Sequence, residues 1–300
     1  MKSKPLVQDN SVTLHDFEAS DRERRLESKK TPTLSVLAMC RDEEKDLPGF
    51  LQHLLPWIDE IVLLDDGSTD RTVAIAKAAG EKVNLICSPR SKGEYFSDKL
   101  NLGLRHVTSE WVIRMDIDER IPPALRGEIL AAIRVSDVDA YSYHRHNFFL
   151  HRPVTGGGWQ LWRTMRLVRS GCFRFEGKIH DKCVLLNPRS QVRHLKHSMW
   201  HYNEDCYEKR RRKSLFYTTV EAETLLQKNV RVGLWHLMVI PFIVLIKRYI
   251  LLLGFRDGIG GWILAFEGMS STFDAYATAW NQQNRIARED IESSFRSLED

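Results

Sequence analysis

Two acidic clusters, 65–66 and 116–119, each follow directly after a short apolar run of the chain. Asp116 and Asp118 are two positions apart, so on a non-helical turn both carboxylates can converge on one cation. Mg²⁺ and Mn²⁺ prefer sites made of a few carboxylates together with phosphate oxygens. A cation held there would neutralise a diphosphate group. For this cluster alone, a solvated acidic turn is the alternative interpretation.

The earlier cluster belongs to the segment D-D-G-S-T-D, which begins at Asp65. A carboxylate at a strand end can accept hydrogen bonds from a nucleobase or a ribose hydroxyl, and Gly67 lets the backbone approach a ligand closely. The alternative is an ordinary turn whose serine or threonine caps the next helix. Each cluster is weak evidence alone, and their occurrence together in this order is more specific.

The elements that must position these clusters alternate between strand and helix. Apolar runs typical of buried strands lie at 34–39, 60–64, 83–87 and 111–115, and helical spacing of apolar residues lies at 43–57, 69–79 and 98–107. This alternation predicts an α/β fold with a single, mainly parallel sheet covered by helices. Ligands of such sheets bind outside the carboxyl ends of the strands, where both acidic clusters are expected to lie.

The alternation ends near residue 140, which suggests a change in organisation. The later predicted strands lie at 141–149, 165–168 and 174–179, with a glycine-rich turn at 156–158 and a charged helix at 206–226. We expect three parts: a flexible polar arm (1–31), an α/β domain (32–205) and a helical C-terminal region (206–300).

Composition narrows the class of protein. The formal net charge of +4 does not require a nucleic-acid partner. The five cysteines are odd in number and form no C-x-x-C pair, which indicates reduced thiols facing the cytosol. The N-terminal segment has no apolar signal-peptide core, so we do not expect export. No G-x-G-x-x-G follows the first predicted strand, which argues against a dinucleotide oxidoreductase.

Four segments together resemble glycosyltransferase family 2. They are 34–44, 60–72 (E-I-V-L-L-D-D-G-S-T-D-R-T), 99–104 and 111–119 (W-V-I-R-M-D-I-D-E). The resemblance covers residues 33–200, and the remainder is similar in character to a lipopolysaccharide-core glucosyltransferase-like branch. It implies the GT-A fold, with a single Rossmann-like sheet, and an inverting, metal-dependent glycosyltransferase (a hexosyltransferase). That enzyme would use a nucleotide-diphosphate sugar, of the UDP type, with Mg²⁺ or Mn²⁺ as cofactor.

The resemblance also implies roles for individual residues. The nucleotide-sugar-binding residues would be Arg41, Glu43, Asp65, Asp66, Lys99 and Asp116. The metal would be held by Asp116, Asp118 and His197, since members of this family often carry a histidine near this position, beside the diphosphate. Lys99 stands where many relatives have arginine, so it keeps the charge but loses the bidentate fork. His194, His197 and His201 have spacings that suit a zinc site on a helix face, but no acidic or cysteine ligand is obviously placed with them.

An inverting transfer needs a base that deprotonates the acceptor hydroxyl. The resemblance implies Asp181 as the base, with His180 as its orienting partner or as a metal ligand, in a segment where the related branch has a V-H-E-like motif. The alternative is a polar turn at a strand end. Trp159 and Gln160 are predicted to bind the acceptor, since aromatic faces stack on sugars, whereas packing in the core is the alternative for the tryptophan.

The C-terminal region contains the most apolar stretch of the chain, 234–255, interrupted by Lys247 and Arg248. A spanning helix needs about 20 apolar residues, and central charges are costly there. We therefore expect a peripheral or re-entrant helix on the cytoplasmic face of the inner membrane, aided by the basic cluster 209–213. A buried core helix or a homo-oligomer interface are the alternatives.

The leading hypothesis is an enzyme that adds one sugar to a lipid-linked glycan or another cell-envelope acceptor. A polyprenyl-phosphate glycosyltransferase is the second hypothesis, and it needs no strong base because its acceptor is already an anion. A non-catalytic, membrane-associated nucleotide-sugar-binding module is the third. Its carboxylates at 65, 66, 116, 118 and 181 would then have no catalytic use.

Overall fold

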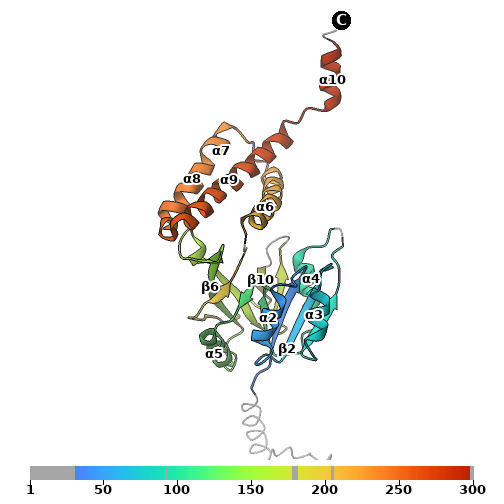
Figure 1. Ribbon diagram of the computed structural model, residues 1–300, viewed down its shortest axis with the longest axis vertical. Helices are drawn as coiled ribbons and strands as arrows, with labels where there is room; N and C mark the ends of the chain where they lie inside the picture. The colour runs from blue at the N-terminus through green and yellow to red at the C-terminus, as the bar shows by residue number, and fades with distance from the viewer. Residues whose placement is uncertain (1–30, 92, 178–181, 204–205, 298–300) are drawn as a thin grey trace, which may run out of the picture.

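The computed structural model describes residues 31–91, 93–177, 182–203 and 206–297. The predicted polar arm therefore lies outside the described residues, except for Thr31. Figure 1 shows an α/β part, with the C-terminal helices stacked above it and the last helix projecting away.

The α/β part is built on four parallel strands. They lie in the order β3 (Val83–Cys87), β2 (Glu60–Asp65), β1 (Leu34–Cys40) and β4 (Trp111–Met115). The intervening helices are α2 (Leu47–Leu54), α3 (Thr72–Ala78) and α4 (Phe96–Leu104). The residues of β4 are all buried, as expected of a strand covered on both faces. The predicted mainly parallel α/β sheet is confirmed.

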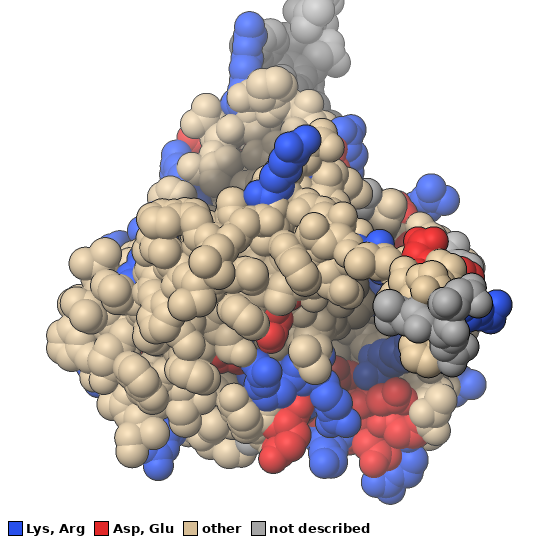
Figure 2. Space-filling model, turned by 90° about the horizontal axis from the view of Figure 1, so that it is seen from above, with Lys and Arg blue, Asp and Glu red and all other residues tan. Residues whose placement is uncertain are grey.

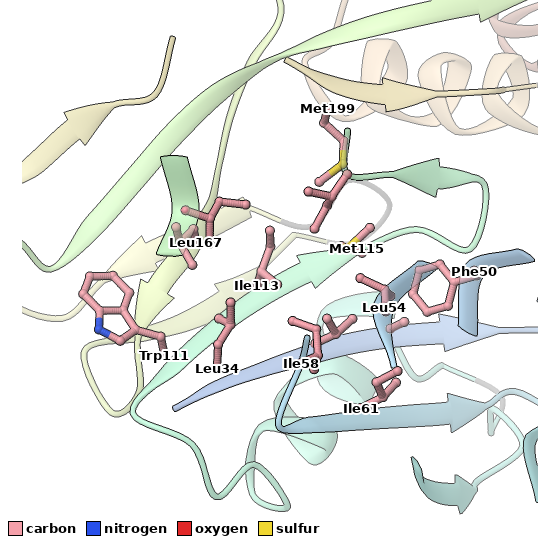
Figure 3. Close-up of a cluster of buried hydrophobic side chains, with 14 of the residues drawn as sticks. Leu34, Phe50, Leu54, Ile58, Ile61, Trp111, Ile113, Met115, Leu167 and Met199 are labelled. Atoms are coloured by element: carbon pink, nitrogen blue, oxygen red, sulfur yellow. The ribbon is translucent and has the colours of Figure 1, made fainter. Parts of the chain in front are cut away.

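One layer of core packs between the sheet and α2. Figure 3 shows Phe50 and Leu54 of α2 against Ile61 of β2 and Ile113 of β4, and all four side chains are 0% exposed. On the other face, Gly103 of α4 lies so close to the sheet that a Cβ there would approach a leucine methyl group of β2 to 2.5 Å. This helix is therefore fixed closely over the strands that carry the acidic loops.

The helix predicted at 43–57 begins only at Leu47. The backbone N–H of Glu43 donates to Thr72 Oγ1 (2.7 Å), and that of Glu44 donates to Asp70 Oδ2 (3.0 Å). Both bonds run to side chains that follow β2, one in the loop and one at the start of α3. The chain segment after β1 is thus tied to the loop that carries the first acidic cluster.

The remainder of the sheet is mixed. After β4 come β8 (Arg163–Arg169), β6 (Ala140–Phe149), β12 (Met199–His201) and β5 (Glu119–Arg120); β7 (Arg152–Val154) and β11 (Val192–His194) also pair with β6. β9 (Phe173–Glu176) and β10 (Lys182–Leu185) form a separate antiparallel pair. The other elements of this part are α5 (Pro123–Ala132) and the single turn η1 (Trp159–Leu161). Pairing of β12 with both β6 and β5 sets His201 beside Asn147 and Glu119.

The C-terminal region is helical, as predicted. It contains α6 (Tyr207–Gln227), α7 (Leu234–Met238), α8 (Ile240–Ile246), the π-helical turn η2 (Lys247–Leu251), the 3₁₀ turn η3 (Gly254–Asp257), α9 (Gly258–Gln283) and α10 (Arg288–Arg296). Helices α6 and α8 pack on α9. The continuous run Leu234–Leu251 has a mean hydropathy of 1.7 and the length of a membrane-crossing helix, yet only 6% of it is buried. The buried-core alternative for this stretch is wrong.

A latch joins the helical region to the α/β part. The carboxylate of Asp257 accepts hydrogen bonds from the backbone N–H groups of Thr155 (2.9 Å) and Gly156 (2.8 Å), and from the Thr155 hydroxyl (2.6 Å). A Cβ on Gly156 would lie 2.3 Å from the Leu253 carbonyl oxygen. Only glycine permits this approach, and the turn at 156–158 is held against η3.

Candidate active site

A cavity of ≈ 590 Å³ lies between the carboxyl ends of β1 and β4 and the C-terminal helices. Its walls come from both parts of the molecule. The residues that line it include Arg41, Glu43, Asp66, Arg90, Arg114, Asp116, Asp118, Arg145, Trp159, Trp162, Arg166, His201, Arg210, Lys213, Phe216, Tyr217 and Arg248. The two acidic clusters meet here, as the parallel topology predicted.

Asp116, Asp118 and His201 form a group whose ligand-type atoms all lie within 4.8 Å of one another. His201 Nε2 is 3.4 Å from Asp118 Oδ2, and His201 Nδ1 is 2.8 Å from Asn147 Oδ1. With an amide oxygen as its partner, Nδ1 carries the proton, so in a neutral ring Nε2 presents a lone pair to the site. Two carboxylates and one such imidazole fit a Mn²⁺-type ion, and their oxygens also suit Mg²⁺.

Asp116 is surrounded by guanidinium groups. Its Oδ1 accepts from Arg114, and its Oδ2 accepts from Arg145 (2.8 Å) and Arg166 (3.0 Å). Burial raises the pKa of Asp116, but the charges of Arg114, Arg166 and Arg145 outweigh it and hold that pKa well below its usual range. Asp116 is therefore ionised and paired with three guanidinium groups at this end of the cavity.

Glu119 fixes the turn that carries this group. Its side chain is 0% exposed, and its Oε2 accepts from the backbone N–H of Asp116 (2.8 Å). Its Oε1 also lies 2.5 Å from Arg145 Nη2. The last residue of the D-I-D-E motif thus orients the first and holds one of the surrounding arginines.

The adjacent carboxylates of the first cluster have different positions. Asp65 is buried and accepts from the backbone N–H groups of Gly67 (3.1 Å) and Ser68 (3.2 Å), so it shapes the turn and does not line the cavity. Asp66 lines the cavity and its Oδ2 accepts from Arg90 Nη2 at 2.5 Å. Of the two, Asp66 is the one whose side chain faces the cavity.

Arg41 and Glu43 line the cavity as well. Burial raises the pKa of Glu43 to about 7, the charge of Lys209 opposes this shift, and the charge of Asp118 adds to it. A carboxyl group that is partly protonated near neutral pH can both donate and accept hydrogen bonds within the site.

Lys99 does not line the cavity. Its ammonium group donates to Ser88 Oγ (2.8 Å) and the Pro89 carbonyl (3.2 Å), and lies 3.0 Å from Glu94 Oε2. Lys99 is 3% exposed, so it is held under the loop after β3. The cavity is lined by Arg90 and Arg114 instead of by the lysine predicted to reach it.

His197 is also placed away from the cavity. Its Nδ1 is 2.9 Å from Glu128 Oε2 of α5, and its side chain is exposed. The histidine that joins the two aspartates is His201. The helical spacing considered for these histidines does not apply, because His194 and His201 belong to strands.

Trp159 lines the cavity, stacked on Trp162 at 6.2 Å between ring centroids and with Arg210 5.7 Å from its ring. Gln160 does not line it: its Oε1 accepts from the Gly158 N–H (3.0 Å), which stabilises the turn. The predicted base Asp181 and its partner His180 lie outside the described residues.

Several lining cations were not predicted. Arg145 and Arg166 lie on β6 and β8, where strand pairing alone brings them to Asp116. Three more come from the helical region, namely Arg210, Lys213 and Arg248. The sequence signal for two of these was the basic cluster 209–213, for which attraction to lipids was predicted.

Comparison with known proteins identifies the family to which the chain belongs. The family model "Glycosyl transferase family 2" matches residues 35–220, and the chain belongs to this family. The chain is 24% identical over 269 residues to "Lipopolysaccharide core biosynthesis glycosyltransferase LpsC" of Rhizobium meliloti, covering 87% of this chain and 97% of that protein. It is 24% identical to "Undecaprenyl-phosphate 4-deoxy-4-formamido-L-arabinose transferase" of Sodalis glossinidius, covering 69% and 60%.

Two solved structures were also matched. Glucosyl-3-phosphoglycerate synthase from Mycobacterium tuberculosis, with Mn²⁺, UDP and glucosyl-3-phosphoglycerate, has a TM-score of 0.32 and 20% identity, over 48% of this chain and 51% of that one. S. aureus TarS has a TM-score of 0.43 and 17% identity, over 85% and 93%. The family and the sheet topology together define a glycosyltransferase of GT-A fold.

Proposed function

We propose that this glycosyltransferase moves a sugar with inversion from a UDP-type nucleotide-sugar donor to a lipid-linked glycan or another cell-envelope acceptor. The observation that carries the proposal is the Asp116, Asp118 and His201 group in a cavity ringed by arginines. Carboxylates with an imidazole suit a divalent ion, and arginines suit phosphate oxygens.

A bound Mg²⁺ or Mn²⁺ would neutralise the charge that develops on the departing diphosphate. Asp118 and His201 would hold the ion with Asp116, while Arg145 and Arg166, which line the same cavity, would contact the phosphates. Asp66, with Arg41 and Glu43, would bind the nucleoside. Asp181 is the proposed base for the acceptor hydroxyl and His180 its orienting partner.

Similarity to LpsC along almost its whole length supports an envelope acceptor. The exposed apolar surface of the helical region supports work at a membrane, proposed to be the cytoplasmic face of the inner membrane. Trp235, Phe242 and Ile250 are 62%, 53% and 55% exposed. Figure 2, seen from above, shows a broad surface of uncharged residues crossed by few Lys and Arg side chains. Large exposed apolar patches mark interaction surfaces.

The test is release of nucleoside diphosphate by the full chain in detergent, with a panel of UDP- and GDP-sugars, with and without Mn²⁺. We expect metal-dependent release from one donor, lost in Asp118→Ala and reduced at least tenfold in His201→Gln. His197→Gln is the matched control and should behave as the wild type. Equal loss in both histidine variants would contradict the ligand assignment.

Binding of UDP and GDP with Mn²⁺ should be measured on the same samples, because hydrolysis without an acceptor is slow. If neither nucleotide binds to the wild type, the proposed donor class is wrong and a non-catalytic module takes its place. Activity that survives Asp181→Ala would favour the polyprenyl-phosphate acceptor, which needs no strong base.

A further inference from the structure

We propose that Arg210, Lys213 and Arg248 form a binding site for a phosphate group carried by the lipid-linked acceptor. The inference rests on the proposed function, since it takes the cavity as the place of transfer. Beyond that function, the acceptor would carry a phosphate group, and these three residues would recognise it.

The three cations come to the cavity from two helical segments. Arg210 and Lys213 are three residues apart on α6, so their side chains share one face of that helix. Arg248 belongs to η2 and lines the same cavity. Phe216 and Tyr217 of α6 are the other lining residues from this region, and among its described residues no Asp or Glu lines the cavity.

A buried carboxylate, that of Glu267, holds Arg210 of the cluster in position. Glu267 of α9 is 2% exposed, and both of its oxygens accept from Arg210 Nε, at 3.0 and 2.9 Å. Arg248 interacts electrostatically with the same Arg210 and Glu267. A Cβ on Gly268 would lie 2.7 Å from Arg248 Nη1, so the small residue there makes room for this guanidinium. A guanidinium held in one orientation binds phosphate oxygens at lower entropic cost.

The cluster lies on the acceptor side of the cavity. The guanidinium of Arg210 is 5.7 Å from the ring of Trp159, in the turn proposed to bind the acceptor. The charge of Lys213 acts on Asp118, so the two residues are within electrostatic reach across the cavity. The donor end has its own cations in Arg41 and Arg90, and the arginines around Asp116. The helical wall thus offers cations of its own in addition to those of the donor end.

The cluster also borders the exposed apolar surface of the helical region, because Arg248 belongs to both. Arg248 is part of the run Leu234–Leu251, whose neighbouring Ile246 and Leu251 are 51% and 71% exposed. Arginine and lysine at the edge of an apolar helical layer commonly contact lipid phosphates. A lipid-borne phosphate would reach this wall when the apolar surface meets a membrane.

The test uses the full chain in neutral detergent and titrates dioctanoyl phosphatidic acid, with dioctanoylglycerol as the dephosphorylated probe. We expect Lys213→Gln to weaken binding of the phosphatidic acid about tenfold, without changing binding of dioctanoylglycerol. Arg212→Gln is the matched control: Arg212 is exposed on the same helix and does not line the cavity. Arg248→Gln should weaken binding at least as much as Lys213→Gln.

Equal weakening in Lys213→Gln and Arg212→Gln would overturn the proposal in favour of general attraction of anions to α6. Binding of UDP with Mn²⁺, measured on the same samples, should be unchanged in Lys213→Gln. If it falls in parallel, the cluster serves the donor diphosphate and the proposal is wrong. Inorganic phosphate alone should compete only weakly, and full competition would mean a site for free phosphate. If the wild type itself does not bind UDP with Mn²⁺, the proposed function is wrong.

Discussion

The position of Glu43 in the cavity gives the protein a defined pH dependence. Burial raises the pKa of this carboxyl to about 7 from the usual 4.5. The folded state therefore keeps a proton that the unfolded state releases, and stability is lost as the pH rises from about 4.5 to 7. Above pH 7 the penalty for ionising Glu43 is complete.

Glu43→Gln should remove this penalty. We expect the variant to match the wild type near pH 4.5 and to exceed it at pH 8 by roughly 1–2 kcal/mol, allowing for partial exposure of the side chain. Urea unfolding at the two pH values measures the difference. A stability gain that is the same at both pH values would show that Glu43 is not the titrating group.

Prediction from the sequence was most successful for residues at the carboxyl ends of strands. Asp66, Asp116 and Asp118 were predicted as site residues and line the cavity, because each follows a strand whose carboxyl end faces it. His201 was missed as the third member of the group, since its place depends on pairing of β12 with β6. That register is a long-range property, and local spacing does not encode it.

At the scale of elements, the latch between Asp257 and the turn at 155–156 couples the two walls of the cavity. Asp257→Asn replaces one acceptor oxygen by an NH₂ group facing backbone N–H donors. We expect a loss of about 1–3 kcal/mol in the free energy of unfolding, measured in urea. Asp274→Asn is the control: Asp274 lies on α9, the helix that follows Asp257, and its side chain makes no hydrogen bond or ion pair with the described residues. Equal effects of both changes would contradict the latch.

Element boundaries show where local patterns failed. The strands at 83–87 and 111–115 were predicted to the residue, because they are apolar runs bounded by polar turns. Helix α2 was predicted four residues too early. Apolar periodicity does not show that the backbone N–H groups of Glu43 and Glu44 are already bonded to Thr72 and Asp70.

At the scale of the whole molecule, the exposed apolar helices make membrane association a measurable expectation. Replacing both Trp235 and Phe242 by serine removes two large exposed side chains from this surface. Since each aromatic side chain buries about 150–250 Å² in an apolar phase, we expect at least a tenfold loss of binding to anionic lipid vesicles in a flotation assay. Phe295→Ser, equally exposed on α10, is the control. Equal loss in the control would contradict a role for this surface.

The two walls of the cavity come from separate stretches of the chain, 39–203 and 210–248. A change in the second stretch can therefore alter what is glycosylated while leaving the donor-binding wall untouched. We therefore expect the helical wall to take part in selecting the acceptor, and a chimera that exchanges residues 206–297 between family members should keep the sugar specificity of the parent that supplies the α/β part. Such an exchange must keep Asp257 and Gly156 together, because this pair joins the two halves.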